Sequence, residues 1–347
     1  MRLLSPPFRS TIAVTLALSG SCVGGVSPEG ELAGRESALA SPGGEVFRPA
    51  PTASDSLTAV ERDRLLADVA ILAHDSMEGR RAGSEGIQRA RRYLVAELAA
   101  RGIAPMDGRF ERSFRFPTGG GEVEAVNLLG VVRGTEHPDE FIVVTAHYDH
   151  LGIREGEIFN GADDNASGTA ALLALAARFA AEPPRHSFLF ALLDAEEMGL
   201  RGAREFIADP PTPLATVLLN VNLDMVSRSE LGELYAAGTH HYPFLAPLVA
   251  DVAGTSGARV LLGHDTPDLP SGDDWTLASD HGPFHEAGIP FLYFGVEDHA
   301  GYHAPSDDFE GITPAFFVQA VETILDFVRL ADARGSEIRA ASGRARP

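Results

Sequence analysis

Short runs of consecutive apolar residues recur along the chain and alternate with segments whose apolar residues are spaced as in helices. Four of these runs are FIVVTA, SFLFALLD, TVLLNVNLDMV and PFLYFGV, at residues 141–146, 187–194, 216–226 and 290–296. Such runs are typical of strands buried on both faces of a sheet. The helical patterns fall at residues 167–182, 200–209, 242–254 and 314–332. This alternation predicts an α/β fold: a single three-layer domain with a largely parallel central sheet and helices on both faces.

The rest of the chain sets the limits of this domain. Residues 23–56 are rich in Gly, Pro, Ser, Ala and Glu and have few large apolar residues, which predicts a flexible linker. From Leu57, two helical patterns precede the first strand. The tail from residue 334 to residue 347 is polar, and we expect it to be frayed. The folded domain is therefore expected to span residues 57–333.

The first 22 residues have the layout of a secretory signal. Arg2 and Arg9 precede a short apolar run at residues 11–18, and small residues follow it. We therefore expect an exported protein that is secreted, periplasmic or lipid-anchored at the cell envelope. Cys22, the only cysteine, stands where a bacterial lipoprotein would carry its lipid, so lipid attachment and ordinary cleavage nearby both stay open. A single cysteine forms no disulfide within the chain.

The net charge narrows the range of partners. The formal charge of the 347 residues is −21 at pH 7. An acidic protein repels nucleic acids and anionic membranes, so we expect neither as a partner, apart from membrane attachment through a lipid at Cys22. The oligomeric state cannot be predicted from these features.

Histidines and carboxylates gather just after the predicted strands. In open α/β sheets, ligands bind beyond the carboxyl ends of the strands, so these residues are candidates for a site. Each could be an ordinary surface or capping residue when taken alone, but together they provide oxygen and imidazole donors, a set that suits zinc or a similar divalent ion. They are His147, Asp149 and His150 after the first strand, Glu196 and Glu197 after the second, Asp224 in the third, and Tyr302 and His303 after the fourth.

Two adjacent carboxylates, Asp163 and Asp164, lie in a loop just ahead of the helical pattern at residues 167–182. Their small neighbours cannot neutralise them, so a cation is needed unless the pair merely caps the helix. Either residue could in principle face that cation.

Five motifs in this order resemble the dizinc aminopeptidase family, which includes bacterial secreted leucyl aminopeptidases, aminopeptidase Y, glutamate carboxypeptidase II and the glutaminyl cyclases. The motifs are AHYDHLG, GADDNASG, LDAEEMGLRGA, NLDM and YHAPSDD. The similarity covers roughly Leu57 to Leu330 and includes the lead-in SMEGRRAGSEG. Five motifs at fitting spacing make this resemblance specific.

The resemblance implies two zinc ions per chain and a role for each site residue. His147 and Asp224 would bind one zinc, and Glu197 and His303 the second. Asp164 would bridge the two, because the family places its bridging aspartate four positions before the glycine that matches Gly168, and the bond after it is cis in the family. The remaining implied roles are a general base for Glu196, an orienting partner of His147 for Asp149, an oxyanion donor for Tyr302 and a support of the pocket for Asp280.

The resemblance implies hydrolysis of peptides. Two zinc ions can activate a shared water, and a glutamate kept off the metal can accept its proton and pass it to the leaving amine. We expect an exopeptidase that most resembles an aminopeptidase releasing N-terminal residues. A carboxypeptidase or dipeptidase on the same metal core is the alternative, followed by a glutaminyl cyclase and by a non-catalytic binding ectodomain. Arg154, Arg201 and Arg228 are candidates for the cation that a carboxypeptidase would need.

Overall fold

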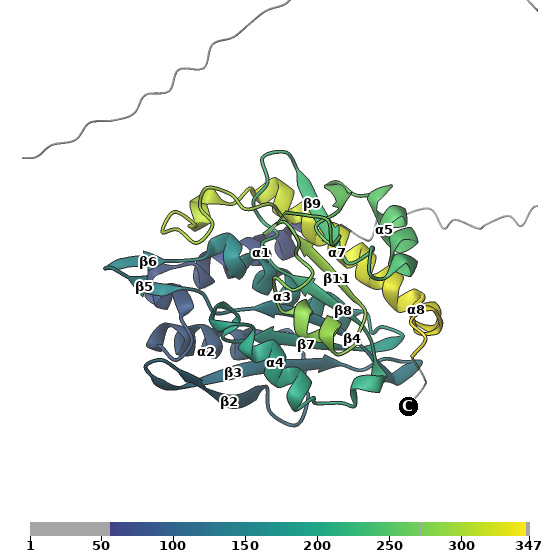
Figure 1. The fold of residues 1–347 in the computed structure, drawn as a ribbon, viewed down its shortest axis with the longest axis horizontal. Helices are drawn as coiled ribbons and strands as arrows, with labels where there is room; N and C mark the ends of the chain where they lie inside the picture. The colour runs from purple at the N-terminus through teal and green to yellow at the C-terminus, as the bar shows by residue number, and fades with distance from the viewer. Residues whose placement is uncertain (1–55, 271, 345–347) are drawn as a thin grey trace, which may run out of the picture. The chain divides into compact units, whose positions relative to one another are not determined.

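Four parallel strands form the centre of a nine-stranded sheet, in the order β7-β4-β8-β11 (Figure 1). They confirm the four strands predicted from apolar runs, because every residue of β7, β8 and β11 is buried. Their bounds are His137–His147 for β4, His186–Leu193 for β7, Val217–Leu223 for β8 and Phe291–Gly295 for β11. Burial on both faces accounts for the absence of polar alternation in these segments.

Antiparallel pairings flank this parallel centre on both sides. On one side β3 (Gly121–Val132) runs antiparallel to β7 and pairs in turn with β1 (Ala104–Pro105) and β2 (Glu111–Thr118). On the other side β9 (Glu233–Ala237) runs antiparallel to β11, and β10 (Arg259–Leu262) lies parallel to β9. A separate hairpin consists of β5 (Gly152–Arg154) and β6 (Glu157–Phe159).

Helices cover both faces of the sheet, as the sequence predicts. The period-2 alternation of strand β4 divides its side chains between two cores: Ile142 and Val144 join the larger core, and Phe141 and Val143 the smaller one. Helices α1, α2, α3, α5, α7 and α8 contribute to the larger core, and α4 and α6 to the smaller. Their bounds are Ala59–Leu72 (α1), Glu85–Ala100 (α2), Gly168–Ala181 (α3), Arg201–Ala208 (α4), Ala246–Ala253 (α5), His281–Glu286 (α6), Pro314–Ala333 (α7) and Gly335–Ala341 (α8).

The expectation of a frayed tail from residue 334 is wrong for residues 335–341. Residues Gly335–Ala341 form helix α8, which follows α7 directly. Ile338 is 1% exposed in the larger core, and Arg339 Nε lies 2.7 Å from Glu140 Oε1. One buried apolar residue and one buried ion pair therefore hold a segment whose composition is otherwise polar.

The structure describes residues 56–270 and 272–344. The predicted signal at residues 1–22, its Cys22 and all of the predicted linker except Ser56 lie outside these ranges. No helix within them is long and apolar enough to cross a membrane.

If α8 is part of the folded domain, Ile338→Ala will lower the free energy of unfolding by about 2–4 kcal/mol, because it removes a fully buried side chain. Ile153→Ala is the matched control, since Ile153 is 52% exposed and should change stability little. Urea denaturation followed by circular dichroism measures both. Equal stabilities for Ile338→Ala and the unaltered protein would contradict the packing of α8.

Candidate metal centre

The carboxyl ends of the parallel strands deliver the candidate residues to one edge of the sheet. His147 is the last residue of β4, Asp224 directly follows β8, and a 3₁₀ turn after β7 carries Glu196 and Glu197. His303 comes from the loop between β11 and α7. Because these strands are parallel, their ends meet on the same side, and residues far apart in sequence become neighbours.

One group of donors consists of His147, Asp164 and Asp224. His147 Nε2 lies 3.3 Å from Asp164 Oδ1 and 3.2 Å from Asp224 Oδ1. All three residues are buried, and their donor atoms lie close enough together to hold one ion.

A second group lies on the other side of Asp164. His303 Nε2 is 3.1 Å from Asp164 Oδ2 and 3.4 Å from Glu197 Oε2. His150 Nδ1 is 2.7 Å from Glu197 Oε1 and 3.6 Å from Asp164 Oδ2. Asp164 thus presents one carboxylate oxygen to each group, and the peptide bond that follows it is cis.

His150 is the member of this cluster that sequence reasoning missed. The sequence places His150 among the candidate donors after the first strand, but the resemblance to the family assigns it no metal-binding or catalytic role. Its ring reaches Glu197 only because the chain turns after β4, and Gly161 leaves room for it, since a Cβ there would lie 2.5 Å from the ring. The strand-end position was the one signal that could have identified it.

Some buried donor atoms in the second group have no hydrogen-bond partner in the part of the chain that the structure describes. Both ring nitrogens of His150 and Oε1 of Glu197 are buried without one, although the imidazole and carboxylate face each other. Such atoms are costly unless something pairs with them. Zinc fits this set of imidazole and carboxylate donors, and the ligand atoms of His150, Asp164 and Glu197 all lie within 4.8 Å of one another.

Within residues 56–270 and 272–344, no arginine forms an ion pair with Asp164, Glu197 or Asp224. The nearby Arg80 donates instead to the backbone carbonyls of Leu72, Tyr148, Asn160 and Gly161. Burial lowers the pKa of Arg80 to about 10, while the carboxylates around it oppose that shift. Arg80 therefore positions the loops around the site and leaves the carboxylates for another cation.

The charges of the cluster favour a cation at the imidazoles. Hydrogen bonds to Asp164 and Glu197 raise the pKa of His303 to about 10. Burial alone would lower the pKa of His147, but Asp224 and Glu196 raise it well above its ordinary value. Burial alone would raise the pKa of Asp164, but His150, His147 and His303 lower it strongly. The field that holds protons on these imidazoles would equally hold a divalent ion.

Glu196 lies beside this cluster and differs from Glu197. Burial raises the pKa of Glu196 well above its ordinary value; His147 opposes the shift, and Asp280 and Asp224 reinforce it. Its backbone N–H donates to Asp149 Oδ1 at 3.0 Å, which fixes the turn. Asp149 Oδ1 is also 3.7 Å from His147 Nδ1, and the carbonyl oxygen of Asp149 is 3.2 Å from the same nitrogen.

Asp280 and Tyr302 also border the site. Asp280 is completely buried, and neither carboxylate oxygen has a hydrogen-bond partner within residues 56–270 and 272–344. Burial raises its pKa to about 8, an effect that His147 opposes. The Tyr302 ring stacks on the His303 ring at a centroid distance of 4.0 Å. Tyr302 is 36% exposed, so its hydroxyl can meet a ligand from solvent.

Asp163 points away from the cluster and fixes the loop instead. Its Oδ1 accepts hydrogen bonds from the backbone and the hydroxyl of Ser227, both at 2.7 Å, and its Oδ2 lies 3.2 Å from His299 Nε2. Asp307 accepts from the backbone N–H groups of Asp163 and Asp164. The adjacent aspartates therefore have separate environments.

A cleft of about 380 Å³ opens onto the donor groups. Its walls include the apolar side chains of Trp275, Leu277 and Val296, and its acidic residues include Glu196 and Asp298. Among the residues that the structure describes, no arginine lines it. Arg154 and Arg201 line a different hollow, which shares Glu197 with this cleft.

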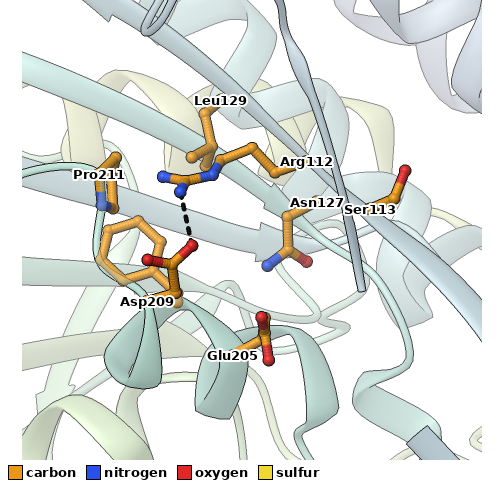
Figure 2. A pocket seen from close by; sticks show the side chains of 8 residues that line it. Arg112, Ser113, Asn127, Leu129, Glu205, Asp209 and Pro211 are labelled. Carbon is orange, nitrogen blue, oxygen red and sulfur yellow. Dashed lines mark hydrogen bonds and ion pairs between the residues drawn. The ribbon is translucent and has the colours of Figure 1, made fainter. Parts of the chain in front are cut away.

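Two other features are poorer candidates for the functional site. The pocket in Figure 2 holds only about 30 Å³, and an ion pair between Arg112 and Asp209, at 2.8 Å, crosses it. A second cluster, His137, Glu140 and His186, lies where β4 and β7 begin. Two of its residues already have ion-pair partners: Glu140 pairs with Arg339, and His186 Nδ1 lies 3.0 Å from Asp332 Oδ1.

Comparisons with known proteins find peptidases among the relatives of this chain. Aminopeptidase YwaD of Bacillus subtilis is 32% identical over 212 residues, which is 57% of this chain and 43% of that protein. The probable glutamate carboxypeptidase VP8 of Zea mays is 32% identical over 200 residues, 53% of this chain and 26% of that protein. The chain therefore matches less than half the length of either relative.

Solved structures show the same fold. A zinc aminopeptidase from Bacillus subtilis superposes with a TM-score of 0.63 at 17% identity, covering 78% of this chain and 95% of that one. A glutaminyl cyclase from Fimbriiglobus ruber gives 0.64 at 21% identity, covering 82% and 99%. The sequence profile of peptidase family M28 matches residues 127–328, which include His147, Asp164, Glu197, Asp224 and His303. The chain belongs to peptidase family M28.

Proposed function

We propose that this protein is a dizinc exopeptidase that releases N-terminal residues from peptides. The observation that carries the proposal is the position of Asp164, with one carboxylate oxygen facing His147 and Asp224 and the other facing Glu197 and His303. The named relatives support it, since they include an aminopeptidase and a zinc aminopeptidase.

His147 and Asp224 would hold one zinc, Glu197 and His303 the second, and Asp164 would contact both. His150, whose ring faces Glu197, adds an imidazole to the second position. Zinc held there would supply Lewis acidity, which would polarise the scissile carbonyl and lower the pKa of the attacking water.

The chain's own groups then handle the protons. Glu196 accepts the proton of the attacking water on its carboxylate and delivers it to the leaving amine, a task that suits a carboxyl whose pKa burial raises. Tyr302, whose ring stacks on His303, donates a hydrogen bond from its hydroxyl to the developing oxyanion. Asp149 keeps the His147 ring in position. Asp280, which is fully buried, supports the pocket beside it.

The charge of the cleft favours an amino terminus as the group it recognises. Glu196 and Asp298 line it, and no arginine of the described ranges does, so these side chains attract a substrate ammonium and repel a free carboxylate. A carboxypeptidase would need a cation here. The arginines of the neighbouring hollow keep a dipeptidase as the second candidate, because they could meet the carboxylate of a short peptide.

The adjacent glutamates give a matched pair of variants. Glu196→Gln should retain two zinc ions per chain and lose about 10²–10⁴-fold in kcat, because it removes a proton acceptor that does not bind metal. Glu197→Gln should bind less zinc, because it removes a charged ligand. Elemental analysis of dialysed protein and steady-state kinetics measure both, and loss of zinc from Glu196→Gln would invalidate the division of roles.

A peptide panel tests the reaction itself. Peptides with a free amino terminus should be cleaved one residue at a time, and a chelator should abolish this. N-acetylation should block cleavage, whereas C-terminal amidation should not. Mass spectrometry identifies the products: release of C-terminal residues would select a carboxypeptidase, and cyclisation of glutaminyl peptides a glutaminyl cyclase. If the protein bound peptides but cleaved none of them, the remaining alternative would be a non-catalytic binding ectodomain.

A further inference from the structure

A cationic hollow lies next to the candidate metal centre. It measures about 330 Å³, and three arginines, Arg81, Arg154 and Arg201, line it together with His150 and Glu197. The arginines come from separate segments: the loop ahead of α2, strand β5 and the start of α4. Because Glu197 lines both the hollow and the cleft, the two cavities are adjacent.

Specific contacts hold the three guanidinium groups around the hollow. Arg154 lies over the ring of Phe159 at 5.7 Å and Arg201 over the ring of Phe116 at 5.4 Å. Arg201 Nε also donates to the carbonyl oxygen of Met198 at 3.0 Å. Arg81 Nη1 donates to the carbonyl oxygen of Leu151 at 3.4 Å. Side chains fixed in this way lose less freedom when an anion binds.

This concentration of positive charge is unusual for the chain. The protein carries a formal charge of −21, and many of its arginines pair with carboxylates. In the part of the chain that the structure describes, no carboxylate pairs with Arg81, Arg154 or Arg201. All three are exposed, so an anion can reach them without displacing a protein partner. Guanidinium groups bind carboxylates through paired hydrogen bonds.

We propose that this hollow binds a carboxylate carried by the part of the peptide that follows the scissile bond. The inference rests on the proposed function. The acidic cleft takes the amino terminus, and the arginine-lined hollow takes the other end of the substrate. The carboxylate is either an acidic side chain of the second residue or the terminal carboxylate of a dipeptide, and both present the same group. The preferred substrates are therefore acidic or very short peptides.

Three peptides with one N-terminal residue separate the two sources: Leu-Gln-NH₂, Leu-Glu-NH₂ and Leu-Gln with a free carboxylate. The proposal predicts a kcat/KM about tenfold higher for at least one carboxylate-bearing peptide than for Leu-Gln-NH₂, the size expected of two or three exposed charge contacts. The faster peptide identifies the source, and added salt should reduce the advantage.

Substitution of the arginines tests the site directly. In the double variant Arg154→Ala, Arg201→Ala, the ratio of kcat/KM for the preferred peptide to that for Leu-Gln-NH₂ should fall close to one. Arg133→Ala is the matched control, because Arg133 is also exposed and lies over a ring, that of Phe141 at 5.5 Å, but does not line the hollow. The control should keep the full ratio, and zinc content is measured in each variant.

The outcomes distinguish the two proposals. A ratio near one in the unaltered protein, or a high ratio that survives the double variant, overturns the anion site and leaves the exopeptidase intact. If none of the three peptides is cleaved by the zinc-loaded protein, the proposed function fails first.

Discussion

The constraint on which this structure depends is the burial of several carboxylates at one edge of a parallel sheet. Asp164, Glu197 and Asp224 converge there with histidines as their ion-pair partners, and the nearby Arg80 donates its hydrogen bonds to backbone carbonyls. Buried carboxylates that repel each other are unfavourable without positive charge between them. Two divalent ions would supply that charge, which explains why a chain that is already acidic places still more acid in its core.

The surrounding architecture keeps these groups in position. Parallel strands bring His147 and Asp224 together, Asp307 and Arg80 hold the loop that presents Asp164, and Asp163 secures that loop to Ser227. Rigid supports of this kind keep ligands in place before the metal arrives. Opposite charges are kept apart at this edge of the sheet. Glu197 lines both an acidic cleft and a separate hollow that is lined by arginines.

The parallel centre of the fold and most of the donor residues could be predicted from the sequence, because strands buried on both faces are read as unbroken apolar runs. Strands β9 and β10 were not predicted, since both are short and the two end residues of β10, Arg259 and Leu262, are exposed. Helix α8 has only Ile338 as a large apolar residue, so its composition resembled a tail. His150 depends on a turn after β4 that no periodicity reports, and its approach to Glu197 is visible only in three dimensions.

The central claim, that this cluster holds a pair of zinc ions, can be tested by anomalous diffraction at the zinc edge on crystals of the purified protein. The account predicts two peaks about 4 Å apart, one beside His147 and Asp224 and the other beside Glu197 and His303, with Asp164 touching both. A single peak, or two peaks that do not share Asp164, would contradict it.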